Sequence, residues 1–147
     1  MEIVKGNLLE APENILVHQT NCMGVMGSGI AKQVKEKYPE VFNGYYNYCK
    51  TNTVENILGT ALICEADDGK LIANVFGQVN YGTDKIYTDY EALRKGLEEV
   101  KVFADQHFLS VALPYNIGCG RAGGDWEIVS KIIEDVFGDV KLYKYEG

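Results

Sequence analysis

Two stretches of the chain share one design: residues 15–37, ILVHQTN-CMGVMGSG-IAKQVKEK, and residues 110–133, SVALPYN-IGCGRAGG-DWEIVSKII. Each has the pattern of a buried strand, a glycine-rich loop and then a helix. Glycine lets the main chain turn sharply and approach a ligand closely, and the first turn of a helix offers N–H groups without partners. Such loops lie at the carboxyl ends of strands in an open α/β sheet, where ligands bind. One such loop alone is typical of a tight turn, but two facing loops are suited to two linked phosphates.

The rest of the chain alternates between strand and helix patterns. Short strands are predicted over residues 1–6 and 140–147, and an amphipathic helix over residues 88–107. Two strands over residues 59–66 and 70–78 flank the turn residues Asp67, Asp68 and Gly69, which indicates a hairpin. Pro39 divides the helical pattern that follows the first loop. These elements predict an α/β fold, a three-layer α/β/α sandwich with a mixed, mostly parallel central sheet.

Length and composition restrict the class of protein. At 147 residues we expect a single domain over 1–147, large enough to bury a core without a disulfide or a metal. No apolar run approaches the roughly 20 residues that span a bilayer, and the N-terminal segment lacks the pattern of a secretory signal. We therefore expect a soluble, cytoplasmic protein that does not bind membranes and acts as a monomer.

The net charge of −7 argues against a polyanionic partner such as DNA or RNA, because long-range repulsion would oppose binding. It does not exclude a small anionic ligand, which main-chain N–H groups can bind. The four cysteines have no C-x-x-C spacing and are interpreted as free thiols. With two histidines and no clustered carboxylates, we expect no metal and no cofactor.

Several polar residues near the two loops are candidates for a site, and each has a structural alternative. His18 lies in an apolar strand, where a core histidine is the commoner role. Asn21 precedes the first loop and would contact a sugar hydroxyl or stabilise the turn. Asp125 begins a helix, where a capping carboxylate is common. Arg121 would pair with phosphate or face solvent, and Cys119 has no second histidine near it in sequence to activate it as a nucleophile.

Two nucleotide-binding motifs are excluded. Gly118, Gly120 and Gly123 match G-x-G-x-x-G, but the remaining chain is too short for the βαβ unit that a dinucleotide fold requires. The first loop lacks the G-K-[ST] ending of a P-loop. A nicotinamide dehydrogenase or a nucleoside triphosphatase is therefore not expected.

Four segments together resemble the macro domain family. They are VKGNLLEAP (4–12), HQTNCMGVMGSGIAKQVKEKYP (18–39), FGQVNYG (76–82) and LPYNIGCGRAGGDWEIV (113–129), and they occur in the order and spacing of that family. The chain most resembles the stand-alone branch that includes ADP-ribose 1″-phosphate phosphatases and terminal ADP-ribose glycohydrolases. The resemblance covers essentially the whole chain and implies a single macro domain over residues 1–147.

The resemblance implies an ADP-ribose pocket formed by the two loops. It places residues 6–8 at the adenine end, with Asn7 where many relatives carry an aspartate, and Tyr145 against the adenine ring. It places Asn21 at the distal ribose and the two loops around the diphosphate. The ligand-binding residues implied in this way are Gly6, Asn7, Leu8, Asn21, Gly24, Val25, Met26, Gly27, Ser28, Gly29, Ile117, Gly118, Cys119, Gly120, Arg121 and Tyr145.

One departure from the family bears on mechanism. The glutamyl-ADP-ribose hydrolases of this branch use a lysine in the mid-chain loop and an aspartate two residues after their G-C-G. In this chain Ala122 stands at the position of that aspartate. Near the position of the lysine the chain has Gln78, Asn80 and Tyr81, and Lys85 comes several residues later. A covalent route through an amine would lack its nucleophile, so we do not expect that mechanism.

The resemblance therefore favours a metal-independent ADP-ribose 1″-phosphate phosphatase that uses an activated water. The hypothesis assigns catalysis to two residues: Asp125 positions the water and His18 assists proton transfer. The partner would be ADP-ribose or ADP-ribose 1″-phosphate, or an ADP-ribosylated protein. Two alternatives stay open, namely a non-catalytic reader of ADP-ribose and a hydrolase of another ADP-ribose ester, protein-linked or nucleic-acid-linked.

Overall fold

The computed structural model describes residues 1–145, which contain a six-stranded mixed sheet. The strands lie in the order β1-β6-β5-β2-β4-β3, and β3 alone is antiparallel to its neighbour. This confirms the predicted mixed, mostly parallel sheet. The strand bounds are β1 Glu2–Lys5, β2 Ile15–Thr20, β3 Ala61–Glu65, β4 Leu71–Phe76, β5 Val111–Pro114 and β6 Lys141–Lys144.

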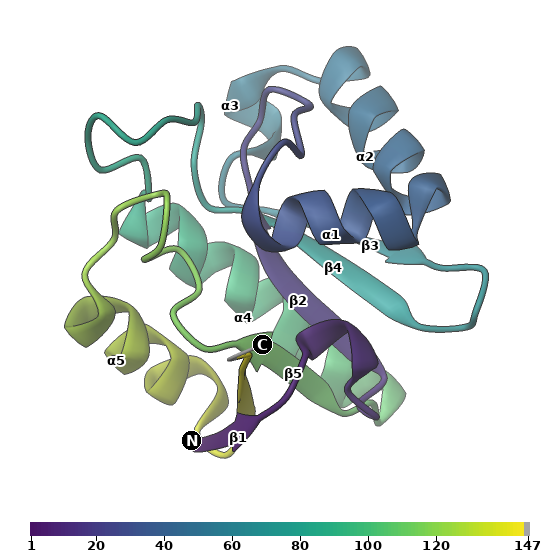
Figure 1. The fold of residues 1–147 in the computed structure, drawn as a ribbon, viewed down its shortest axis with the longest axis vertical. Coiled ribbons are helices and arrows are strands. Elements are labelled where there is room, and N and C mark those ends of the chain that lie inside the picture. Colours follow the sequence, from purple (N-terminus) through teal and green to yellow (C-terminus); the bar gives the residue numbers. More distant parts are fainter. Residues whose placement is uncertain (146–147) are drawn as a thin grey trace.

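Helices cover both faces of the sheet, as Figure 1 shows, which confirms the three-layer α/β/α architecture. The sequence did not predict two short elements, the 3-10 helix η1 and helix α3. Within residues 1–145 no helix is both long and apolar enough to cross a membrane. The helix bounds are η1 Leu8–Glu10, α1 Gly29–Lys37, α2 Pro39–Thr51, α3 Val54–Ile57, α4 Tyr90–His107 and α5 Trp126–Phe137.

Local sequence explains where these elements begin and end. Helix α2 starts at Pro39, because a proline at the first helical position lacks only an N–H that would have no helical partner. Asp89 caps α4, its carboxylate accepting a hydrogen bond from the Ala92 N–H. Helix α4 ends at His107, and the next residue, Phe108, has the left-handed conformation with φ +57°. The β3–β4 hairpin turns at Asp67–Gly69, as predicted.

Two hydrophobic clusters lie on opposite faces of the sheet. On one face α1, α2 and η1 pack around Tyr45 and Phe76, whose rings stack with centroids 5.9 Å apart. On the other face α4 and α5 pack around residues such as Leu97 and Ile133. Side chains of a strand alternate between faces, so His18 lies on the α1/α2 side and Gln19 on the α4/α5 side.

The neighbouring strands β2 and β5 form the switch point of the sheet, because the chain continues from them toward opposite edges. From β2 it continues toward β4 and β3, and from β5 it continues toward β6. The β2–β5 pairing ends at Leu16 and Ala112, before either strand ends, so the two strand ends separate. Ligands of open α/β sheets bind at the carboxyl ends of strands at such a switch point. Three connections follow the strands that end here (Figure 1): the first glycine loop (residues 21–28), the mid-chain loop (77–89) and the second glycine loop (115–125).

Candidate active site at the sheet switch point

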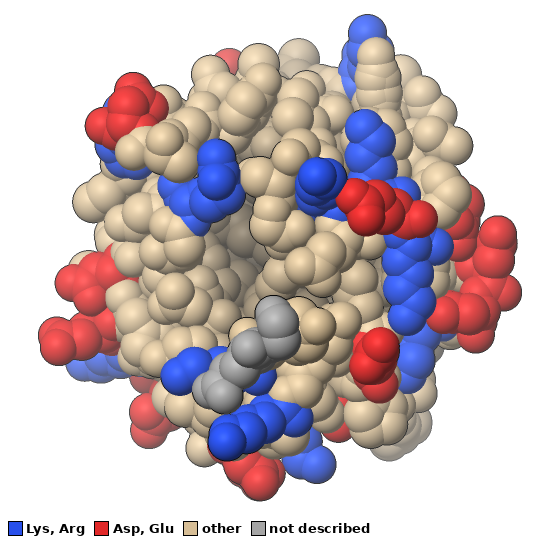
Figure 2. All heavy atoms as spheres, viewed as in Figure 1, with Lys and Arg blue, Asp and Glu red and all other residues tan. Residues whose placement is uncertain are grey.

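A cavity of about 510 Å³ lies between the two glycine loops, at the carboxyl ends of the strands. Figure 2 shows this face hollowed at its centre, with Lys and Arg side chains around the hollow and Asp and Glu mainly toward the periphery. The lining residues are His18, Gln19, Thr20, Asn21, Val25, Gly27, Ser28, Gly29, Ile30, Ala31, Gln78, Tyr81, Gly82, Pro114, Tyr115, Asn116, Ile117, Gly118, Gly120, Arg121 and Ala122.

Asn21 organises the first glycine loop. Its Nδ2 donates to the Val25 carbonyl at 2.8 Å, and its Oδ1 accepts from the Met23 N–H at 2.9 Å and from the Val25 N–H at 3.4 Å. The buried hydroxyl of Tyr45 in α2 lies 2.8 Å from both Oδ1 and the main-chain oxygen of Asn21. The Asn21 amide therefore holds the loop that forms one wall of the cavity.

Helix α1 begins at the cavity without a side-chain cap. Its N-cap residue, Ser28, makes no capping hydrogen bond, and Ser28, Gly29 and the first residues of the helix line the cavity. Gly29 has φ +60°, a conformation that favours glycine. Unpaired N–H groups and the positive end of the helix dipole favour an anion at this place.

The second glycine loop is built by main-chain turns. The Cys119 N–H donates to the Asn116 carbonyl at 2.9 Å, and the Gly124 N–H donates to the Gly118 carbonyl at 2.9 Å. Helix α5 begins after this loop, and Asp125 caps it by accepting from the Glu127 N–H at 2.9 Å. Asp125 is exposed and is not among the residues that line the cavity. The N-terminus of α5 is therefore occupied by a carboxylate, unlike that of α1.

His18 lies at the floor of the cavity, only 2% exposed. Its Nε2 is 2.7 Å from Oδ1 of Asn74 in β4, and Asn74 donates through Nδ2 to the Leu62 carbonyl at 3.0 Å. Since the Asn74 oxygen accepts, Nε2 carries the ring hydrogen and Nδ1 carries the lone pair. Nδ1 has no partner among the described residues. Burial lowers the pKa of His18 to about 4, against an opposing effect of the Asn74 hydrogen bond, so the ring is neutral at pH 7.

Charged groups are scarce in the cavity. Among the described residues that line it, Arg121 is the only one with a permanent charge. Cys119 is not a lining residue, and burial, followed by the nearby charge of Asp125, raises the pKa of its thiol to about 11. A thiolate nucleophile is therefore disfavoured there. Lys85 is exposed in the mid-chain loop, with Nζ 5.2 Å from the centre of the Tyr87 ring.

Comparison with known proteins identifies the family. The model of the Macro domain family matches residues 17–133. The chain belongs to the Macro domain family. Over 136 residues it is 35% identical to a DNA ADP-ribosyl glycohydrolase of Mycobacterium tuberculosis. The matched segment covers 90% of this chain but only 37% of that protein. It is 25% identical to an ADP-ribose 1″-phosphate phosphatase of Saccharomyces cerevisiae over 97% of this chain and 96% of that protein.

The fold agrees with solved structures of this family. The macrodomain of Mycobacterium tuberculosis DarG superposes with a TM-score of 0.80 at 30% identity, over 98% of this chain and 95% of that one. The chain thus spans only about 37% of the length of the curated glycohydrolase that it matches, but nearly the whole of the solved macrodomain.

The macro domain brings ten of the sequence-predicted site residues together around the cavity. They come from β2, the first glycine loop, the start of α1 and the second glycine loop. They are His18, Asn21, Val25, Gly27, Ser28, Gly29, Ile117, Gly118, Gly120 and Arg121. Their contacts with a ligand stay a prediction.

Other predicted residues lie outside the cavity lining. The side chain of Met26 is 2% exposed and packs in the hydrophobic core, so only its main chain is available to a ligand, and that contact stays a prediction. Leu8 is also buried there. Asn7 uses its Oδ1 to accept from the Leu9 N–H and so caps η1. Gly6 donates through its N–H to Lys144, and the following Tyr145 is 61% exposed. Gly24, Cys119 and Asp125 are likewise absent from the lining.

Several cavity residues were missed by the sequence analysis as ligand neighbours. Tyr115 and Asn116 directly adjoin predicted residues and lie just after β5, so their position in the chain was the available signal. Gln78 and Tyr81 come from the mid-chain loop, where they were considered only as replacements for a lysine. Nothing local in the sequence showed that Asn74 would hold His18.

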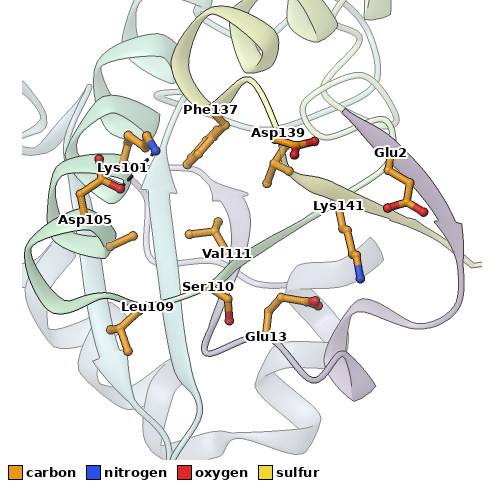
Figure 3. Close-up of a pocket in the computed structure, with 12 residues that line it drawn as sticks. Glu2, Glu13, Lys101, Asp105, Leu109, Ser110, Val111, Phe137, Asp139 and Lys141 are labelled. Atoms are coloured by element: carbon orange, nitrogen blue, oxygen red, sulfur yellow. Dashed lines mark hydrogen bonds and ion pairs between the residues drawn. The ribbon is translucent and has the colours of Figure 1, made fainter.

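A second cavity, of about 330 Å³, lies at the opposite, amino-terminal edge of the sheet (Figure 3). Some of its polar groups are paired, either with each other or with residues outside its lining. Lys101 forms an ion pair with Asp105 at 3.1 Å, and Glu13 accepts from the Tyr143 hydroxyl at 2.6 Å. Within residues 1–145, no cluster of three or more His, Cys, Asp or Glu could hold a metal at this or any other place. The switch-point cavity, which is lined by both glycine loops and by the uncapped start of α1, is therefore the candidate active site.

Proposed function

We propose that this macro domain binds ADP-ribose in the switch-point cavity and acts as a metal-independent ADP-ribose 1″-phosphate phosphatase. The observation that carries the binding proposal is the arrangement of the two glycine loops around the uncapped N-terminus of α1. Main-chain N–H groups and Arg121 provide donors for the diphosphate without requiring a positively charged protein. This accounts for anion binding by a chain with a net charge of −7.

The chemistry of the lining favours phosphate hydrolysis over glycoside hydrolysis. Glycosidases commonly place two carboxylates around the scissile bond, and none of the described lining residues is Asp, Glu or Lys. Phosphoryl transfer depends mainly on positioning and on stabilisation of the phosphate charge. Arg121 and the loop N–H groups would supply that stabilisation.

In the proposed reaction, the oxygen of a water molecule attacks phosphorus and the bond from phosphorus to the ribose oxygen breaks. The ribose oxygen receives a proton, and the products are ADP-ribose and inorganic phosphate. His18 is neutral at pH 7, and its buried Nδ1 has no partner among the described residues, so it would accept a hydrogen bond from a water that enters the floor of the cavity. Asp125 lies outside the lining, so its water-positioning role requires a movement of the second glycine loop.

A second candidate is removal of ADP-ribose from DNA. Relatives that are 35% identical are named DNA ADP-ribosyl glycohydrolases, and Lys and Arg side chains surround the hollow despite the negative net charge. Such a local distribution would favour a phosphate backbone over the cavity. The absence of a carboxylate or an amine from the described lining residues places this candidate second.

The test is a set of three assays on the whole chain with EDTA present. Calorimetry measures ADP-ribose binding, and two activity assays use ADP-ribose 1″-phosphate and an ADP-ribosylated DNA oligonucleotide. We expect binding and phosphate release, with release reduced at least tenfold in Arg121→Gln. Release of ADP-ribose from the oligonucleotide alone would favour the second candidate. Binding without either reaction would identify a reader, and absence of ADP-ribose binding would overturn the proposal.

A further inference from the structure

One side-chain amide connects the three segments around the cavity. Gln19, near the end of β2, donates through Nε2 to Oε1 of Gln78 at 2.7 Å and to Oγ1 of Thr88 at 3.0 Å. Thr88 in turn donates through its hydroxyl to the Gly118 carbonyl at 2.6 Å. This series of hydrogen bonds, Gln78–Gln19–Thr88–Gly118, thus joins β2, both ends of the mid-chain loop and the second glycine loop.

The hydrogen-bond partners fix the orientation of the Gln19 amide. Gln78 donates through Nε2 to the Asn80 carbonyl at 2.8 Å, so its Oε1 faces Gln19. Thr88 gives its hydrogen to Gly118, so its oxygen can only accept from Gln19. Both neighbours present acceptors, and the two hydrogens of Gln19 Nε2 satisfy them.

Two glycines give the Gln19 amide the space that it occupies. A Cβ on Gly77 would overlap Oε1 of Gln19, and a Cβ on Gly118 would lie 2.9 Å from the same oxygen. Gly77 does not have a positive φ, so glycine is needed here only because a larger side chain would not fit, and not because of the main-chain conformation. Oε1 has no hydrogen-bond partner among the described residues. The Gln19 side chain is therefore packed tightly between the beginnings of two cavity walls.

We propose that Gln19 and Thr88 are positioning residues that fix the separation between the mid-chain loop and the second glycine loop. Gln78 and Tyr81 line the cavity from the first of these loops, and Gly118 and Arg121 line it from the second. Their separation sets the width of the space for the distal end of the ligand. This inference rests on the proposed function for the identity of that ligand, ADP-ribose.

The primary test compares Thr88→Val with Thr88→Ser. Valine keeps the shape of threonine and removes the hydroxyl, whereas serine keeps the hydroxyl. We expect Thr88→Val to weaken ADP-ribose binding about tenfold, because it removes two hydrogen bonds and leaves Gln19 with an unpaired N–H. Thr88→Ser should bind within about twofold of wild type, since its hydroxyl restores the connection.

Thr60→Val is the matched control. Thr60 donates to the Ile57 carbonyl at 2.7 Å and does not line the cavity. This variant loses one hydroxyl–carbonyl bond and should keep wild-type affinity. If Thr88→Val bound ADP-ribose as tightly as wild type, or if Thr88→Ser failed to restore binding, the positioning role would be overturned.

A double-mutant cycle on Gln19→Ala and Gly77→Ala tests the geometry without any ligand. Gly77→Ala should lower the midpoint of thermal unfolding when Gln19 is present and have little effect when Gln19 is alanine, because the overlap is then removed. Additive effects would overturn the proposal whether or not ADP-ribose is the ligand. Failure of wild type to bind ADP-ribose, with coupling retained, would instead locate the error in the proposed function.

Discussion

The two glycine loops resemble each other in sequence, yet they are held in different ways. The first glycine loop is organised by one amide, that of Asn21, which bonds to Met23, Val25 and Tyr45. The second is organised by main-chain turns and by contacts with the mid-chain loop, including the 2.8 Å hydrogen bond from the Tyr87 N–H to the Ala122 carbonyl. Both loops thus bond to the mid-chain loop, the first through the Cys22 N–H and the Val79 carbonyl at 2.9 Å, but a side-chain amide fixes the turn of the first loop and main-chain bonds fix the turns of the second.

The helices that follow the two loops also differ, in their capping and in where they begin relative to the cavity. Helix α1 has no side-chain cap and begins at the cavity, whereas α5 is capped by Asp125 and begins outside the cavity lining. Only the first loop thus presents the free N-terminus of a helix to a ligand. The two segments therefore differ in function despite their similar sequences. The first is suited to bind an anion at the start of its helix, and the second forms the opposite wall of the cavity.

The largest expected effect is that of Asn21→Ala, which removes the organising amide of the first loop. The Met23 N–H loses its acceptor and the Val25 carbonyl loses its donor, while the Tyr45 hydroxyl keeps the main-chain oxygen of residue 21, so we expect a loss of about 4 kcal/mol in the free energy of unfolding. ADP-ribose affinity should fall at least 100-fold. Urea denaturation and calorimetry measure the two effects.

Tyr45→Phe is the matched control for this variant. It removes one donor and leaves the Asn21 amide in place, so it should cost only about 1 kcal/mol of stability. Equal effects of the two substitutions would show that packing in α2, and not the Asn21 amide, holds the first loop.

The strands that lead to the loops also differ, because β2 carries the buried His18. The unfolded histidine binds its proton near pH 6.5, and the folded one only near pH 4. The unfolded state therefore binds more protons between these values. Stability is fully present above pH 6.5 and decreases as the pH falls to 4, by about 3 kcal/mol from this residue.

Urea denaturation from pH 7.5 to 4 of wild type and His18→Asn measures this contribution as the difference between the two curves. The exposed His107 provides the control, since His107→Gln should keep the wild-type loss of stability in acid. A difference curve for His18→Asn that is flat over this range would contradict the burial of a neutral ring.

The sequence was sufficient to predict the layers, the hairpin and both glycine loops, because periodicity and turn residues are local signals. Strands β2 and β5 and helices α1 and α5 lie where residues 15–37 and 110–133 predicted them. The capping of α5 by Asp125 is one of the two roles that the sequence predicts for this residue, because capping depends on adjacent residues.

The hydrogen-bond centres of the site could not be predicted, because they join residues that are distant in the chain. Tyr45 is 24 residues from Asn21, and Thr88 is 69 residues from Gln19. Nothing in either local pattern specifies such a pair. The burial of Met26 was missed for a related reason: the turn of the first loop, and not its composition, decides which side chains face the core.

A smaller effect is expected from glycines that face open space. No atom lies within 4 Å of a Cβ built on Gly29 or on Gly120, so neither substitution causes a clash. Gly29 has φ +60°, and Gly120 does not have a positive φ. Gly29→Ala should therefore cost about 1.5 kcal/mol of unfolding free energy, and Gly120→Ala should cost none. Thermal unfolding distinguishes them, and equal costs would show that the main chain of the first loop relaxes.

The smallest expected effect on stability tests the capped helix. Asp125→Ala should cost about 1 kcal/mol, because the Glu127 N–H loses its acceptor, whereas Asp125→Asn keeps an accepting oxygen and should cost almost nothing. The two variants also separate capping from catalysis. If phosphate release survives in Asp125→Asn, the carboxylate charge is not required, and the residue serves the second glycine loop only by fixing the start of α5. If release is lost in a variant that remains folded and binds ADP-ribose, Asp125 reaches the substrate during turnover, and the second loop must then move to bring it there.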